Sequence, residues 1–165
     1  MANFAVQVIN SVGSAFRSAG VVYVNSSTGL NRRLQVYEIN VGQVATAYAS
    51  TDTGILWDVS RLGASAGLTA TVTAPNPLDG GDTLAMLANY FTAASAEPTY
   101  TTQGNGLSLY SWPINQRGFN RWRALDDGDQ IVVPAVAFNG IGIRLLCTAG
   151  AQAFSGVGTL ALIER

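Results

Sequence analysis

A two-residue alternation of side-chain character is the feature that most constrains the fold of this chain. In Leu34–Val41 it divides the residues into two predicted faces, Gln35, Tyr37, Ile39 and Val41 on one and Leu34, Val36, Glu38 and Asn40 on the other. Successive side chains of a strand point to opposite faces of a sheet, so this pattern predicts a β-strand. The same reasoning, with β-branched and aromatic content, predicts further strands at Phe4–Ile9, Gly20–Val24, Ile55–Leu62, Leu68–Thr73, Leu107–Trp112, Phe119–Ala124, Gln130–Val133, Ile141–Cys147 and Thr159–Ile163.

One segment, Asp82–Phe91, follows a helical pattern instead. Asp82 is a good N-cap residue, and Leu84, Leu87, Ala88 and Phe91 share one helical face. The pattern predicts a short helix here.

The spacing of the strands favours a sandwich over a simple meander. Turns rich in Gly, Asn, Asp and Ser separate most of the strands, but longer gaps occur at about residues 42–54 and 74–106. Such gaps are typical of Greek-key crossings. We therefore predict an all-β, jelly-roll-like antiparallel β-sandwich with at most one short helix, and a single domain over residues 1–165, a length that can bury one core.

The composition points to a folded chain whose surface is partly covered. Of its residues 48% are hydrophobic and only 12% charged, and all nine basic residues are Arg. Disordered chains show the opposite balance. Interfaces between proteins favour Arg and aromatic residues and disfavour Lys, so we expect assembly, with compositional drift as the other explanation.

The residue inventory excludes most catalytic and metal chemistry. There is no His and one Cys, so zinc or copper sites of the usual kind and His-dependent nucleophilic sites cannot be built in one chain. The absence of Lys removes Schiff-base and Ser-Lys chemistry. We predict no catalytic residue, no metal site, no cofactor and no enzymatic activity. Cys147 follows apolar residues and is expected to be a buried, inert thiol.

Carboxylates leave two further possibilities open. Asp126, Asp127 and Asp129 surround Gly128, and Asp79 and Asp82 flank two glycines, so either group offers oxygen ligands for Ca²⁺. Turn formation is the preferred interpretation, because tight turns select Asp and Gly. A glycosidase pair of Asp58 and Glu38 is the other possibility.

Arginine and aromatic residues concentrate in residues 115–123. In a strand, Phe119, Arg121 and Arg123 point one way, while Asn120, Trp122 and Ala124 point the other. Nucleic-acid binding is disfavoured by the sequence pI of about 5.2 and the lack of Lys. Internal ion pairs, such as Arg61 or Arg121 with Asp58, compete with a protein interface. The candidate interface or structural residues are Trp57, Asp58, Arg61, Arg117, Phe119, Arg121, Trp122 and Arg123.

Two other features bear on partners. The strand Ile55–Leu62 mixes apolar and polar residues on both faces, so we expect it to be covered on both sides. Aromatic residues in strands are most often part of a core, and their alternative role is sugar binding, because aromatic faces stack on sugar rings. Tyr23, Tyr37, Tyr48, Tyr110 and Trp112 are the candidates for a carbohydrate-binding or receptor-binding module.

Several segments together resemble a known protein class. The segments 59–69 (VSRLGASAGLT), 75–79 (PNPLD), 115–122 (NQRGFNRW) and 132–135 (VVPA) are similar to those of small jelly-roll proteins of tailed-bacteriophage virions, which resemble tumour-necrosis-factor-like trimers and serve as capsid decoration or cement proteins. The resemblance implies a homotrimer that binds the major capsid protein on the capsid exterior and clamps it without covalent chemistry.

The expected location follows from the resemblance and from two absences in the sequence. Residues 1–9 lack the basic and continuous apolar regions of a signal peptide, and no apolar stretch approaches the about 18 residues of a membrane span. We therefore expect synthesis in the host cytoplasm and no membrane partner.

Overall fold

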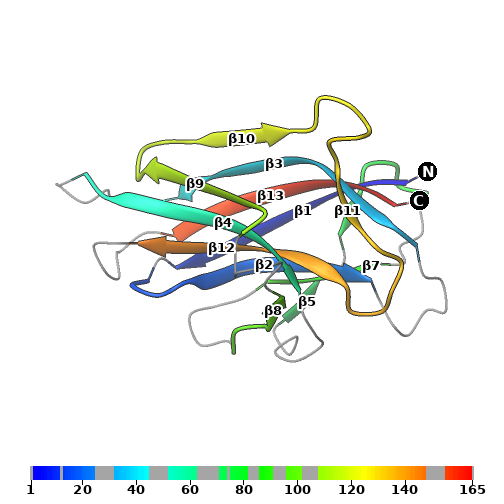
Figure 1. The fold of residues 1–165 in the computed structure, drawn as a ribbon, viewed down its shortest axis with the longest axis horizontal. Coiled ribbons are helices and arrows are strands. Elements are labelled where there is room, and N and C mark those ends of the chain that lie inside the picture. The colour runs from blue at the N-terminus through cyan, green and yellow to red at the C-terminus, as the bar shows by residue number, and fades with distance from the viewer. Residues whose placement is uncertain are drawn as a thin grey trace.

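The computed structural model describes residues 2–11, 13–24, 32–44, 52–62, 71–73, 75–81, 86–90, 96–101, 108–147 and 155–164. These residues form an all-β antiparallel β-sandwich of two sheets (Figure 1). Among them there is no helix, and hence none with the length and apolar character to cross a membrane.

The first layer, called the β13 sheet here, has the strand order β10-β3-β13-β1-β6, with β11 also paired to β3. Its strands are β1 (Ala2–Ser11), β3 (Leu34–Val44), β6 (Asn76–Pro77), β10 (Asn120–Arg123), β11 (Ile131–Val133) and β13 (Ser155–Glu164).

The second layer, the β12 sheet, has the order β5-β7-β2-β12-β4-β8, with β9 also paired to β4. Its strands are β2 (Arg17–Val24), β4 (Gly54–Leu62), β5 (Thr71–Thr73), β7 (Met86–Tyr90), β8 (Tyr100–Thr101), β9 (Tyr110–Asn115) and β12 (Gly140–Cys147). The chain changes sheet repeatedly, as in β1 to β2, β2 to β3 and β12 to β13, which confirms the predicted crossing topology.

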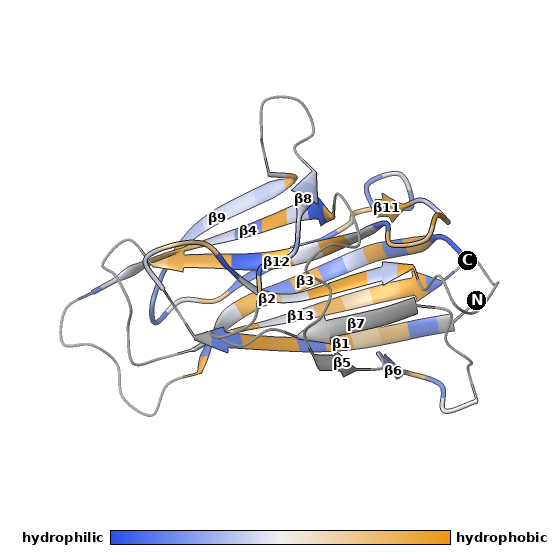
Figure 2. Ribbon diagram, turned by 90° about the horizontal axis from the view of Figure 1, so that it is seen from below, coloured by the Kyte–Doolittle hydropathy of each residue, from blue (hydrophilic) through white to orange (hydrophobic). Residues whose placement is uncertain are grey.

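The core lies between the two sheets and draws side chains from both. Phe4, Val6 and Val8 of β1 face Trp57 and Val59 of β4 across it, all buried. Figure 2 shows apolar and polar residues alternating along the strands, as expected where one face packs on a core and the other does not. Cys147 is a free, fully buried thiol in this core, as predicted.

Aromatic residues close the sandwich along one side. Tyr110 of β9 stacks on Trp112, with ring centroids 5.7 Å apart, and packs on Trp122 of β10 at 5.0 Å. Figure 1 shows β9 and β10 lying together at the top of the molecule, each at the edge of its own sheet. These rings therefore join the two layers.

The predicted helix at Asp82–Phe91 is wrong over residues 86–90. These residues form β7, which pairs with β2 through contacts from Gly20↔Tyr90 to Val24↔Met86 and with β5 on its other side. Asp82 and Phe91 lie outside the described residues. A short apolar run fits either period, and here the hydrogen-bonding edge of β2 decides the outcome.

The predicted faces of β3 are also only half right, because the strand contains a bulge. Glu38 pairs with Ala161 but Val36 pairs with Leu162, so Tyr37 is an extra residue in β3. A bulge of one residue reverses the facing of everything beyond it. As a result Leu34, Val36, Ile39 and Val41 are all buried on one face.

Close packing leaves no room for a side chain at two glycines, Gly142 and Gly156. A Cβ on Gly156 would lie 2.7 Å from the Trp57 ring, and one on Gly142 would lie 2.7 Å from the Tyr100 ring. The glycines therefore give two large aromatic side chains room to lie flat against neighbouring strands.

Candidate functional site

The predicted residues separate into two groups. Arg117, Phe119, Arg121 and Arg123 lie on or before the edge strand β10 and are exposed, whereas Trp57, Asp58 and Arg61 belong to β4 in the other sheet. Trp122 is also on β10 but is not exposed like its neighbours, because its ring points inward and packs on the core.

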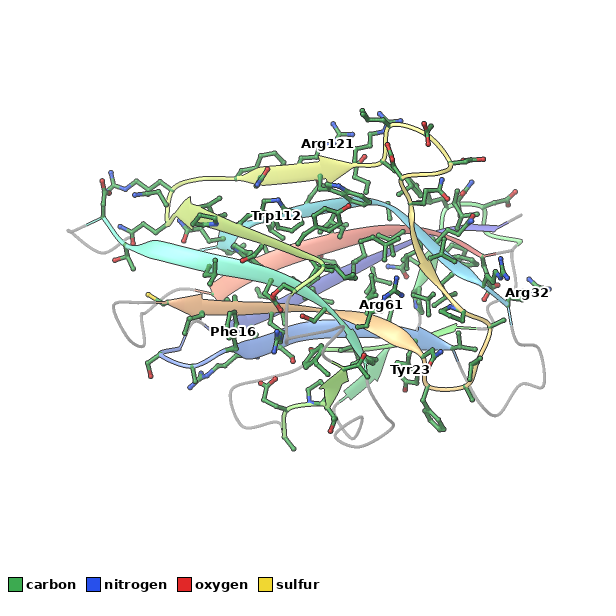
Figure 3. All side chains as sticks on the ribbon, in the orientation of Figure 1. Phe16, Tyr23, Arg32, Arg61, Trp112 and Arg121 are labelled. Atoms are coloured by element: carbon green, nitrogen blue, oxygen red, sulfur yellow. The ribbon has the colours of Figure 1, made fainter. Side chains whose placement is uncertain are left out.

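Two exposed residues of β10, Arg121 and Arg123, and the residue before the strand, Phe119, form what we call the arginine ridge. The predicted alternation of this strand is confirmed, since these three are exposed while Asn120 and Trp122 are partly buried. Arg121 lies opposite Asn40 and Arg123 opposite Glu38, so both arginines continue the outer face of the β13 sheet. In Figure 3 Arg121 lies above β10, away from the core.

An ion pair joins the ridge to β3. Arg121 Nη2 lies 2.6 Å from Glu38 Oε2, and Asn40 Nδ2 donates to Glu38 Oε1 at 2.8 Å. The hydrogen bond from Arg121, followed by that from Asn40, lowers the pKa of Glu38 from its ordinary value. The predicted partner of Arg121 was Asp58, which is wrong because β10 lies beside β3 and not beside β4.

The outer face of the β13 sheet has an unusual character for a surface. The outward residues of β1 pair with those of β13 as Asn3↔Ile163, Ala5↔Ala161, Gln7↔Thr159 and Ile9↔Val157. All are at least partly exposed, and none carries a charge. We call these eight residues the open face. Residues 117–119 and 123–127 border this surface.

A pocket of about 370 Å³ lies where the open face meets the ridge. Phe119, which is 67% exposed, lines it together with Gln7, Asn40 and Thr159. Arg117 also lines the pocket. The pocket thus combines one exposed aromatic ring with uncharged hydrogen-bonding side chains. We call it the Phe119 pocket.

The β4 group is buried on both sides, as predicted. Trp57 and Val59 point into the core, while Asp58 and Ser60 point to the opposite face of the β12 sheet and are buried there too. The coverage of this second face comes in part from a polar cluster that the sequence did not reveal.

This buried polar cluster consists of Ser18, Asp58, Ser60, Glu97, Tyr100 and Arg144. Arg144 Nε donates to Asp58 Oδ2 at 2.6 Å, and Arg144 Nη2 donates to the Ser60 hydroxyl at 3.0 Å. Arg144 therefore takes the place that was predicted for Arg61 or Arg121. Its guanidinium also lies over the Tyr100 ring, 4.5 Å from the centroid.

Tyr100 extends the cluster to β8, and Glu97, which is exposed, extends it to the segment before that strand. Glu97 accepts hydrogen bonds from the Ser18 backbone N–H at 3.0 Å and from the Ser18 hydroxyl at 2.5 Å. The Tyr100 hydroxyl lies 2.6 Å from the same Ser18 oxygen. Burial raises the pKa of Tyr100 well above its ordinary value. The cluster fastens residues 97–100 to the β12 sheet.

One signal in the sequence pointed to the missed residue Arg144. It stands alone among apolar residues in Ile141–Cys147, and a charge in a strand covered on both sides requires a partner. Glu97 and Ser18 carried no comparable signal, because they meet only through the fold.

The structure supports neither the catalytic carboxylate pair nor a calcium site at Asp126–Asp129. Glu38 faces outward from the β13 sheet and Asp58 outward from the β12 sheet, each with its own arginine, so the structure does not bring them together as a catalytic pair. In the Asp126–Asp129 segment, Asp126 Oδ1 accepts from the Gly128 N–H at 2.7 Å, which is turn chemistry. Within the described part of the chain, no three Asp, Glu or Cys residues are grouped to hold a metal ion.

Most of the predicted sugar-stacking aromatics are used in packing. Tyr110 and Trp112 close the sandwich, and Tyr23 is buried against Phe138, while Tyr37 is partly buried and Tyr48 lies outside the described residues. Phe119, which was not among them, is the ring that the described structure leaves exposed beside a pocket.

Comparison with known proteins adds no family. No family model matches the chain, and no curated protein sequence matches it.

Proposed function

We propose that this protein is a non-enzymatic structural protein of a bacteriophage virion, a decoration or cement protein that assembles as a homotrimer and binds the exterior of the capsid. The observation that carries the proposal is the open face, eight uncharged and at least partly exposed residues on two regularly paired strands. The resemblance of the sequence to virion jelly-roll proteins supplies the biological setting.

The chemistry of the open face suits contact with protein. Ala5, Ala161 and Val157 are short or apolar, so a partner can approach them closely. The charges beside them, Glu38 and Arg121, already form an ion pair with each other. The ridge arginines border this surface, in keeping with the preference of interfaces for Arg. In this proposal the open face makes the contact between subunits, and the ridge with Arg117 contributes to the contact with the major capsid protein.

The first experiment measures the native mass by light scattering over a dilution series. We expect a trimer that persists on dilution. The variant Ala5→Glu places a charge in the middle of the open face, on a partly exposed position opposite the uncharged Ala161 and Asn76, and should dissociate the trimer. Val136→Glu is the matched control, because Val136 is 55% exposed in the loop between β11 and β12.

Circular dichroism must show that both variants fold. A wild-type monomer at all concentrations contradicts the proposed assembly, and equal dissociation by the two variants removes the open face from it. Co-sedimentation of the wild-type protein with undecorated phage heads then tests the capsid partner separately.

Saccharide binding is a second candidate function, favoured by the Phe119 pocket. An exposed ring can stack on the apolar face of a sugar while Asn40, Gln7 and Thr159 bind its hydroxyl groups. A glycan array followed by calorimetry tests this function. We expect Phe119→Ala to weaken binding about tenfold or more, since ring contacts contribute about 1–3 kcal/mol, and Leu125→Ala, at a 93% exposed position outside the pocket, to leave it unchanged. Equal effects of the two variants would argue against a sugar site.

A further inference from the structure

A second pocket, of about 400 Å³, lies at the C-terminal end of β4 and contains Arg61, which has no acidic partner among the described residues. We call it the Arg61 pocket. It is formed where the two sheets meet, from Arg61 and Leu62 of β4, Thr101 of β8, residues 132–134 at the end of β11, and Asn139 with Gly140 at the start of β12. Figure 3 shows Arg61 between the end of β4 and the chain near β11.

The polar contacts of Arg61 leave its charge uncompensated. Arg61 Nη1 donates to the Val132 carbonyl oxygen at 2.8 Å, and Arg61 Nε is buried with no hydrogen-bond partner in the described part of the chain. Among the described residues no carboxylate pairs with this guanidinium. Arg144 of the same sheet, which is partly buried like Arg61, does have an acidic partner, Asp58.

A partly buried cation of this kind is costly unless something pairs with it. None of the residues lining the pocket is acidic, so the pocket offers a positive potential that nothing lining it cancels. The side-chain hydroxyl of Thr101 and the amide of Asn139 add uncharged hydrogen-bonding groups. The remaining lining is apolar, with Leu62 and Val133 buried and Pro134 at the edge.

From this arrangement we propose that the Arg61 pocket binds a small organic carboxylate. The carboxylate pairs with the charged Arg61 guanidinium through a charge-assisted hydrogen bond. The apolar body of the ligand lies against Leu62, Val132 and Pro134. The site is separate from the open face and does not depend on the proposed capsid role.

The test is an NMR titration of the ¹⁵N-labelled protein that follows the Arg61 Nε–H resonance, assigned by its loss in Arg61→Gln. The probes are butanoate and benzoate, with butanamide and benzamide as uncharged analogues of the same shape, and inorganic phosphate as a compact anion. We expect saturable shifts with the carboxylates and binding about tenfold or more weaker for the amides, because charge-assisted hydrogen bonds are lost.

Two variants locate the effect. Arg61→Gln should abolish carboxylate binding, followed through the backbone amides of Thr101 and Gly140, while Arg123→Gln, an exposed arginine outside this pocket, should leave it unchanged. If Arg61→Gln fails to fold, the comparison of acids with amides on the wild-type protein still shows whether the pocket requires a carboxylate.

Three outcomes overturn the proposal. The first is the absence of saturable shifts up to about 50 mM ligand, a concentration well above a millimolar dissociation constant. The second is equal binding of acids and amides, which would show that the pocket binds apolar groups only. The third is equal loss of binding in the two variants, which would show non-specific charge attraction. Tight binding of phosphate with none of the carboxylates reassigns the pocket to inorganic anions and also contradicts the proposal.

Discussion

Gly156 shows how a single missing side chain determines the packing of the core at the residue scale. The Trp57 and Leu145 side chains occupy the space that a Cβ would need, at 2.7 Å and 2.6 Å. We expect Gly156→Ala to destabilise the protein by about 1–3 kcal/mol, as overpacking of a rigid core does. Urea denaturation measures the change. Gly80→Ala is the control, since no atom lies within 4 Å of that position and its stability should be nearly unchanged.

Tyr100 gives a pH dependence at the same scale. Burial raises the pKa of its phenol in the folded state, so the neutral form is favoured there. The resulting stability is fully present below the ordinary tyrosine pKa of about 10 and is lost as the pH rises above it. We expect the melting temperature to fall above about pH 10 and to fall less in Tyr100→Phe, which loses about 1 kcal/mol at neutral pH with its hydroxyl. Parallel curves for the two proteins between pH 9 and 11 would contradict this assignment.

At the scale of elements, the buried polar cluster joins β4, β12, β2 and the segment before β8. Removing Arg144 leaves Asp58 buried without its cation, so Arg144→Met should cost about 3–5 kcal/mol, whereas Asp58→Leu combined with Arg144→Met should cost much less than the sum. Chemical denaturation of the two single variants and the double variant measures this coupling. Additive effects would show that the ion pair between Asp58 and Arg144 contributes little.

The same scale shows what the sequence predicts and where it stops. Strands such as β1, β4 and β12 were predicted within a few residues, because their alternation and β-branched content are local properties. The strand at β7 and the bulge at Tyr37 depend on which strand lies alongside, so local periodicity misjudged both. The exposure of Phe119 and Arg121 followed from alternation on an edge strand. The ion-pair partners of Asp58 and Arg121 could not be predicted in this way. They are Arg144 and Glu38, which lie 86 and 83 positions away in the sequence.

At the scale of the whole molecule, both sheets contribute to one core, and we expect them to unfold together. Leu160 of β13 and Ile143 of β12 are both fully buried and belong to the same cluster. Truncating either to Ala should destabilise the protein by about 2–5 kcal/mol and lower one shared transition. Tryptophan fluorescence, which reports on Trp57 in the β12 sheet and Trp122 in the β13 sheet, and far-ultraviolet circular dichroism should then melt at the same temperature. Separate transitions, each shifted by only one of the variants, would show that the sheets are independent units and would contradict a single domain over residues 1–165.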